Sequence, residues 1–137
     1  VGIHAAKSSN RFEALEPIRQ GIRERFGGYA AQRATGLSVR HDHGSAHLSD
    51  VVQEELRFLG AASSPALVRK PQGNGCAERF IRTLKENLLW VHPFTTVEKL
   101  RQALLAFKES YNQSWRIERH GFKTPAQARK LLLEAAA

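Results

Sequence analysis

Short strand-like segments alternate with amphipathic helical segments along the first half of this 137-residue chain. Apolar residues alternate with polar or small ones in residues 1–5 and 37–42, and a third short strand is predicted at residues 61–64. Between them, apolar residues recur at helical spacing in residues 12–26 and 49–60, and glycine ends both runs. Because strands separated by helices pack in layers, we predict an α/β architecture.

Three further helices are predicted in the second half of the chain. The first begins after the glycine-rich segment at residues 71–75, which we expect to be the most flexible part of the sequence. Thr95 and Glu98 have the spacing of a capping box at the start of the second helix. Thr124 and Gln127 repeat that spacing, with a proline at the first helical position of the last helix.

Charge and cysteine content limit the class of protein. The formal net charge is +8 at pH 7, and the 21 Lys and Arg residues are spread along the chain, which favours a folded protein that binds a polyanion. A basic surface that only keeps the protein in solution is the alternative. The single cysteine, Cys76, cannot form an internal disulfide, so we expect a reducing, intracellular compartment. No apolar run approaches the roughly 18 to 20 residues needed to span a bilayer.

Two carboxylates are the candidate catalytic residues. Asp42 ends a predicted strand and Glu78 lies near the start of a predicted helix, with 35 residues between them. Carboxylates from two such elements are what a two-metal phosphoryl-transfer site requires. Arg82 and Lys85 follow Glu78 at i+4 and i+7, so all three are expected on one polar helix face.

Several residues in and around these segments also fit simpler or different roles. Glu78 can pair with Arg82 at i+4, an interaction worth only about 0.2 to 0.5 kcal/mol. The histidines around Asp42 suggest zinc, but they and the distant Cys76 do not make a closed tetrahedral set. Cys76 lacks an identifiable base, and the glycines near residue 74 lack the Lys-Ser/Thr ending of a P-loop. Trp90 and Trp115 are better explained as core or interface residues than as platforms for stacked bases.

Three sequence blocks carry a family resemblance. They are the Asp-x-Gly-Ser turn at residues 42–45, the Asn-Gly-x-Ala-Glu-Arg-Phe-Ile-Arg-Thr-Leu-Lys block at residues 74–85, and Tyr-Asn at 111–112 followed by Thr-Pro-Ala at 124–126. In this order and spacing, the chain from Val39 to Lys130 resembles the catalytic core of bacterial insertion-sequence transposases. Those enzymes are similar to retroviral integrases and share the ribonuclease H-like fold, a mixed sheet flanked by helices.

The resemblance implies DNA integration or transposition by metal-dependent strand cleavage and strand transfer. In the family, two Asp and one Glu hold two divalent ions, Mg²⁺ or Mn²⁺, about 3.5 to 4 Å apart. Asp42 takes the place of the second carboxylate and Glu78 of the third. The DNA phosphates would be bound by four basic residues, namely Lys70, Arg79, Arg82 and Lys85. The resemblance also implies a homo-oligomer that acts on transposon ends and target DNA in the bacterial cytoplasm, at the nucleoid.

The first family carboxylate has no counterpart in this sequence. No aspartate precedes Asp42, and two of the three earlier glutamates, Glu13 and Glu16, fit solvated positions of the first helix. We therefore expect a core truncated at its N-terminus (residues 1–112), with its first strand or strands missing, followed by a C-terminal extension with a short helix (residues 113–137). Such a chain should be an impaired catalyst. The alternatives are a non-catalytic DNA-binding or oligomerisation module, and a nuclease of the same fold that cuts without joining.

Overall fold

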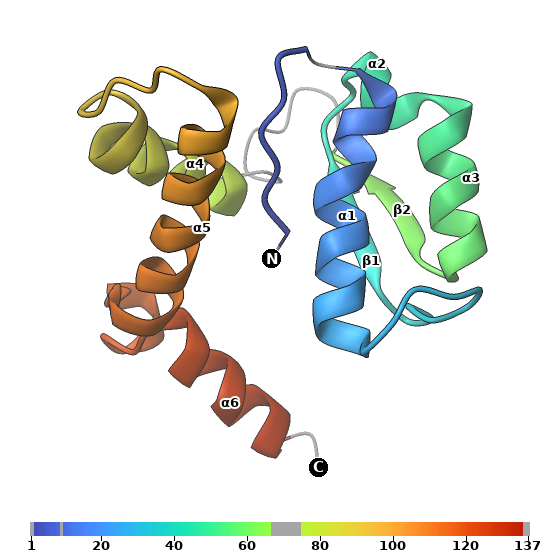
Figure 1. Cartoon of the computed structure of the whole chain (residues 1–137). Helices are drawn as coiled ribbons and strands as arrows, with labels where there is room; N and C mark the ends of the chain where they lie inside the picture. Colours follow the sequence, from blue (N-terminus) through green and yellow to red (C-terminus); the bar gives the residue numbers. More distant parts are fainter. Residues whose placement is uncertain (1, 9, 67–74, 136–137) are drawn as a thin grey trace. The chain divides into compact units, whose positions relative to one another are not determined.

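The computed structural model describes residues 2–8, 10–66 and 75–135, and the chain forms two compact units, Val1–Asn87 and Leu88–Ala137. The first unit contains a small parallel sheet with helices, and the second is helical (Figure 1).

Helix α1 spans Arg11–Phe26, close to the predicted range. Its first turn is capped by Asn10, whose side chain accepts hydrogen bonds from two backbone N–H groups. At the other end, Gly27 adopts a left-handed conformation with φ of 70°, which glycine takes without a steric penalty. Leu15 and Ile22 are buried, so the apolar stripe of this helix faces the core as predicted.

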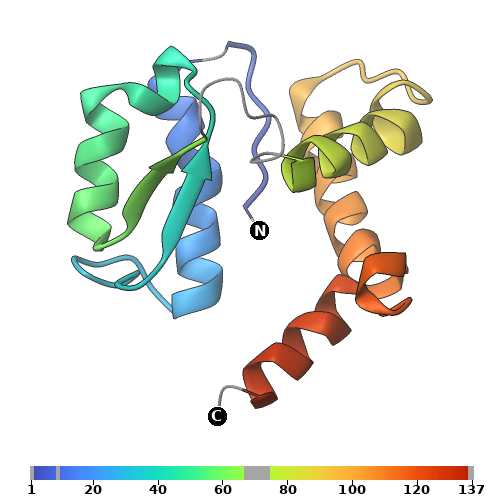
Figure 2. The same cartoon turned by 180° about the vertical axis from the view of Figure 1, so that it is seen from behind.

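The sheet consists of two parallel strands, β1 (Ser38–His41) and β2 (Ala62–Pro65), paired with Ser38 opposite Ala62. Their arrowheads point to the same edge in Figure 2. Parallel neighbours need a crossover connection, and here it contains the short helix α2 (Ser45–Leu48) and helix α3 (Asp50–Leu59). The predicted strand, helix and strand are therefore present, and the predicted α/β class is confirmed.

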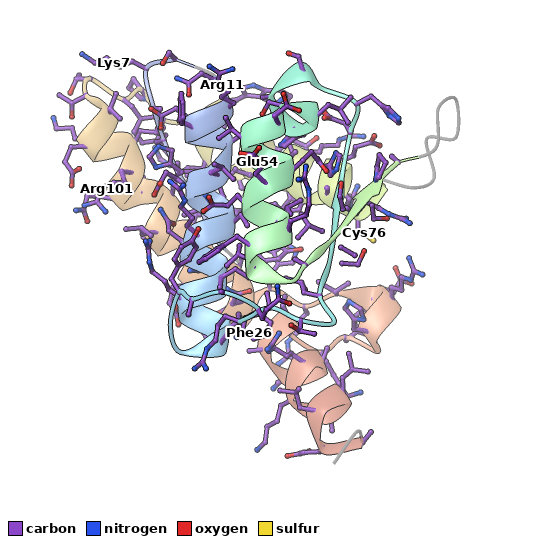
Figure 3. All side chains as sticks on the ribbon, turned by 90° about the vertical axis from the view of Figure 1, so that its right-hand side faces the viewer. Lys7, Arg11, Phe26, Glu54, Cys76 and Arg101 are labelled. Carbon is purple, nitrogen blue, oxygen red and sulfur yellow. The ribbon has the colours of Figure 1, made fainter. Side chains whose placement is uncertain are left out.

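Helices α1 and α3 lie together on one face of the strands, as the edge-on view in Figure 3 shows. Ser49 occupies the N-cap position of α3, although its hydroxyl donates to the carbonyl of Ala46 instead of capping the helix. Gly60 ends α3 with φ of 72°. The core between helices and sheet is formed by seven buried residues: Leu15, Ile22, Ala34, Val52, Leu56, Leu59 and Ala61.

The segment before α1 is not the strand predicted at residues 1–5, because residues 2–6 pair with no strand in the described part of the chain. This segment lies against α1 instead. The amide of Ile3 donates to the side chain of Gln20 at 3.2 Å, and Gly2 approaches α1 so closely that a Cβ there would clash with the carbonyl oxygen of Pro17. Pro17 itself lies inside α1, past its first turn.

Helix α4 spans Gly75–Leu84 and continues into a π-helical turn, Lys85–Leu89. The helical spacing of its apolar residues predicts that Ile81 and Leu84 face a core. Leu84 is buried as predicted, whereas Ile81 is 46% exposed, so its prediction as a core residue is wrong. The second buried residue of α4 is Thr83.

The second unit begins its main helix, α5, at Val97 and ends it at Ser114. The predicted capping box of Thr95 and Glu98 is wrong by one residue. Thr96 is the N-cap, and its hydroxyl accepts a hydrogen bond from the amide of Lys99. Glu98 is one position too early to return that bond, and its carboxylate is bound by side chains one turn further along the helix.

A 3₁₀ turn (Glu118–His120) leads to the last helix, α6 (Pro125–Ala135). Here the predicted capping box is confirmed. The amide of Thr124 donates to the Gln127 side chain at 3.0 Å, and the amide of Gln127 donates to the Thr124 hydroxyl at 3.3 Å. Reciprocal bonds of this kind satisfy two backbone donors that a helix start leaves without partners.

Both tryptophans lie in the second unit and are exposed, Trp90 by 70% and Trp115 by 39%, so neither is a core residue. Trp115 stacks on Tyr111 with ring centroids 5.8 Å apart. No helix among the described residues is both long and apolar enough to cross a bilayer. The domain division after residue 112 stays a prediction, and the loop predicted at residues 71–75 lies outside the described residues except for Gly75.

Candidate active site

Asp42 lies at the edge of the sheet, immediately after β1. One carboxylate oxygen, Oδ1, accepts hydrogen bonds from the backbone N–H of Gly44 at 2.9 Å and from Nδ1 of His47 at 3.0 Å. These donors lower the pKa of Asp42, the Gly44 amide being the larger cause and the His47 ring the next. The carboxylate is thus ionised at neutral pH, and its other oxygen accepts no hydrogen bond from a described residue.

Gly44 leaves room in this turn for the side chain of Asp42. Its φ of −58° is accessible to any residue, so a special backbone conformation is not the explanation. A Cβ at this position would lie 2.8 Å from Oδ1 of Asp42. Glycine therefore makes room for the carboxylate that its own amide binds.

His41 is buried beneath the same turn, with 7% of its surface exposed. Its Nδ1 lies 2.7 Å from the backbone carbonyl of Asp42, and its Nε2 lies 2.8 Å from the hydroxyl of Ser63 on β2. Both ring nitrogens are therefore occupied, which argues against His41 as a zinc ligand. His43 is exposed.

Glu78 is exposed near the start of α4, in the first turn. Its side chain has no hydrogen bond or ion pair with a described residue. Arg82 does not pair with it, because Nε of Arg82 donates to Glu86 at 2.8 Å. Arg79 and Lys85 are also exposed, so the basic residues predicted to contact DNA are accessible on α4 and its extension. The fourth, Lys70, lies outside the described residues.

The chemistry of these side chains fits a hard divalent cation, since two carboxylates offer the oxygen ligands that Mg²⁺ and Mn²⁺ prefer. Three or more His, Cys, Asp or Glu side chains that could share an ion are not found together in the described parts of the chain. Asp42 is held by Gly44 and His47, and no described contact joins it to Glu78. Their convergence on one site stays a prediction.

The sheet does bring the chain leading to Glu78 back to Asp42. The parallel register places Pro65 opposite His41, and the amide of Ala66 donates to the His41 carbonyl at 2.8 Å. The residue that follows β2 therefore lies at the same edge as Asp42. From Ala66 the chain reaches Glu78 in 12 positions.

A solved structure matches the chain over most of its length. The catalytic core domain of BIV integrase superposes with a TM-score of 0.61 at 22% identity, covering 97% of this chain and 77% of that domain. The fold is therefore ribonuclease H-like, as predicted.

Sequence comparison identifies the relatives more closely. Residues 60–125 match the family model described as "Integrase core domain". The transposase of insertion sequence element IS904 from Lactococcus lactis is 34% identical over 82 residues, which cover 60% of this chain and 32% of that protein. Transposase InsD of insertion element IS2 from Escherichia coli is 28% identical over 132 residues, covering 91% of this chain and 42% of that protein.

The chain is thus similar to insertion-sequence transposases and to a retroviral integrase core, as its sequence blocks indicated. It spans less than two thirds of the length of these two transposases. The region matched by the family model includes β2, α4, α5 and the capping residue of α6, but it begins at residue 60 and so does not contain Asp42.

Proposed function

We propose that this chain contributes Asp42 and Glu78 to a metal-dependent site for DNA strand cleavage and strand transfer. The observation that carries the proposal is the state of Asp42. It is an ionised carboxylate at a sheet edge, fixed through one oxygen by two donors, while its second oxygen has no hydrogen-bond partner among the described residues. That is what a ligand for a hard cation needs.

The placement of Glu78 is supported by topology. The parallel pairing returns the chain to the Asp42 edge at Ala66, and a connection of 12 positions is long enough to bring Glu78 to that edge. The match of residues 60–125 to an integrase core domain includes Glu78 and its helix.

Bound by these carboxylates, Mg²⁺ or Mn²⁺ would supply Lewis-acid stabilisation of the charge that develops on phosphate oxygens. The chain's own residues would bind the DNA. Arg79 and Lys85 present exposed positive charges beside Glu78 for the phosphates. Arg82 can take part with the guanidinium nitrogens that Glu86 leaves open.

We further propose that this chain alone has little activity, since the family site uses three carboxylates and the sequence offers no aspartate before Asp42. A third acidic residue supplied on an added upstream strand should raise strand transfer.

The test uses a labelled duplex with Mg²⁺ or Mn²⁺, and compares this chain with a longer version carrying such a strand. Asp42→Asn and Glu78→Gln should each abolish the activity of the longer version. If either variant remains fully active, that carboxylate has been assigned wrongly. Hydrolysis of the duplex without joined product would instead identify a nuclease.

DNA binding has its own test. Phosphate recognition makes log K fall linearly with log salt, with a slope of roughly −0.9 for each neutralised phosphate. Replacing Arg79 and Lys85 with Gln should make the slope shallower by about one to two units. Lys99→Gln on α5 is the matched control for loss of an exposed charge and should leave it unchanged. A salt-independent affinity in the unmodified chain would rule out binding through phosphates.

A non-catalytic DNA-binding or oligomerisation module is the second candidate. It is favoured by the lack of a three-ligand cluster among the described residues. This candidate predicts salt-dependent DNA binding that Asp42→Asn does not alter, and no activity even after an upstream acidic strand is added. Whether the chain is catalytic or only binds DNA, we expect a homo-oligomer, which light scattering coupled to gel filtration would detect.

A further inference from the structure

His47 contacts the Asp42 carboxylate, and His41 links the Asp42 backbone to Ser63; the proposed metal-binding role of Asp42 does not by itself explain these contacts. We propose that His47 is a positioning residue for the Asp42 carboxylate, and that His41 and Ser63 hold the backbone beneath it. This inference rests on the proposed function of Asp42 as a metal ligand, and it concerns what fixes that ligand before any cation binds.

The contact of His47 with Asp42 has a defined direction. An ionised carboxylate only accepts hydrogen bonds, so Nδ1 of His47 must carry the proton in the 3.0 Å contact with Oδ1. The same oxygen accepts the Gly44 amide at 2.9 Å. Two donors on one oxygen restrict the rotation of the Asp42 carboxylate and hold it in one orientation.

His41 secures the backbone of the same residue. A carbonyl can only accept, so Nδ1 of His41 donates to the Asp42 carbonyl at 2.7 Å. In the neutral ring Nε2 then accepts the hydroxyl proton of Ser63 at 2.8 Å. Ser63 belongs to β2, so this chain of hydrogen bonds ties the Asp42 backbone to the neighbouring strand as well as to its own.

The backbone of His47 is held by two hydrogen bonds, and its ring packs on a neighbouring ring. Its backbone amide donates to the Gly44 carbonyl at 3.0 Å, and its carbonyl accepts from the Gln53 side chain on α3 at 2.8 Å. The ring stacks on that of His41 with centroids 5.7 Å apart. A donor held by its neighbours in this way loses little conformational entropy when it binds the carboxylate, which is the requirement for a pre-organised ligand.

The experiment uses the isotope-labelled chain without metal, and follows the Gly44 amide proton by NMR. In the unmodified chain this resonance should lie downfield because the amide donates to a carboxylate. His47→Ala should move it upfield and speed its exchange with solvent, since Oδ1 is no longer held. His47→Asn keeps an N–H donor at the same distance along the side chain and should restore both. His43→Ala is the control, because His43 is an exposed histidine next to Asp42 and is not part of the contacts described above.

A second measurement is the affinity for Mn²⁺, taken from the spectrum of the free ion. Loss of a residue that orients a metal ligand typically weakens binding about 10- to 100-fold. We expect such a loss in His47→Ala, recovery in His47→Asn and no change in His43→Ala. Ser63→Ala should move the Gly44 resonance in the same direction as His47→Ala, but less.

The outcomes separate the two proposals. A Gly44 resonance that His47→Ala leaves in place overturns the positioning role, whatever the metal does. A shift that His47→Asn does not reverse also overturns it, because the ring would then act through packing. If Asp42→Asn binds Mn²⁺ as well as the unmodified chain, the metal assignment fails, while the Gly44 resonance still decides whether His47 positions the carboxylate. If Ser63→Ala leaves the Gly44 amide resonance in place, His41 and Ser63 play no part in positioning Asp42.

Discussion

Gly44→Ala tests the geometry of the Asp42 turn most directly. The new Cβ would lie 2.8 Å from Oδ1 of Asp42, closer than such atoms approach, while the backbone angles of Gly44 suit alanine. The carboxylate must therefore rotate away. It then loses the hydrogen bonds from the Gly44 amide and the His47 ring.

The size of the effect follows from two opposing contributions. Each lost bond is worth about 0.5 to 1 kcal/mol, at the low end of the usual range because the Asp42 side chain is 64% exposed and screened by water. Against that loss of about 1 to 2 kcal/mol, alanine restricts the unfolded chain and stabilises the fold by about 0.4 to 1 kcal/mol. The net destabilisation is small, so the pKa of Asp42 is the better observable.

That pKa should rise toward its ordinary value in Gly44→Ala, because both groups that lower it are lost. A carboxyl whose pKa is lowered by folding stabilises the protein above its unfolded pKa, and this stabilisation disappears as the pH falls through the folded pKa. The difference in unfolding free energy between the two chains should therefore shrink in acid.

Carbon NMR of the Asp42 carboxyl group measures the pKa, and thermal unfolding at several pH values measures the stability difference. Gly28→Ala is the matched control, since a Cβ at Gly28 meets nothing within 4 Å. It should leave the pKa of Asp42 unchanged. An unaltered pKa in Gly44→Ala would refute the account of this turn.

Two further predictions concern the second unit. Thr124→Ala should destabilise α6 by about 1 kcal/mol, and Thr124→Ser should recover most of the lost stability. Hydrogen exchange of the first-turn amides of α6 measures both effects. Equal exchange rates in the unmodified chain and the two variants would exclude the capping box. Hydrogen bonds from Arg101, the largest cause, and then from Gln102 lower the pKa of Glu98 to about 2. Its contribution to stability should thus be present above the ordinary carboxyl pKa of 4.5 and vanish as the pH falls toward 2, and Glu98→Gln should flatten the dependence of melting temperature on pH over this interval. An unchanged slope in Glu98→Gln would contradict the assignment.

The elements that the sequence predicted well are those whose ends and faces are set locally. Gly27 and Gly60 both adopt the left-handed conformation that ends α1 and α3, and the apolar spacing within each helix predicted its buried face. Thr124 and Gln127 likewise act within one turn. Such features depend on neighbours along the chain, which a single sequence displays.

The wrong sequence predictions concern features that depend on a contact with a distant residue, or on a choice between two adjacent residues. Alternation over five residues predicted a strand before α1, but the segment binds Gln20 on that helix instead. At α5 two adjacent threonines offered the same cap, and the structure uses Thr96. The contacts of Asp42 with His47 depend on the short helix α2, which the sequence did not predict, and the link from His41 to Ser63 depends on strand pairing.

The π-helical turn at Lys85–Leu89 has a consequence for how the chain tolerates changes in length. In a regular α-helix, one inserted or deleted residue rotates every later side chain by about 100°. A wider turn absorbs the additional residue locally, and Leu84 before it and Leu88 within it are both only 9% exposed. Deleting one residue from this turn should therefore yield an ordinary helix rather than a broken one, with the acidic start of α4 undisturbed.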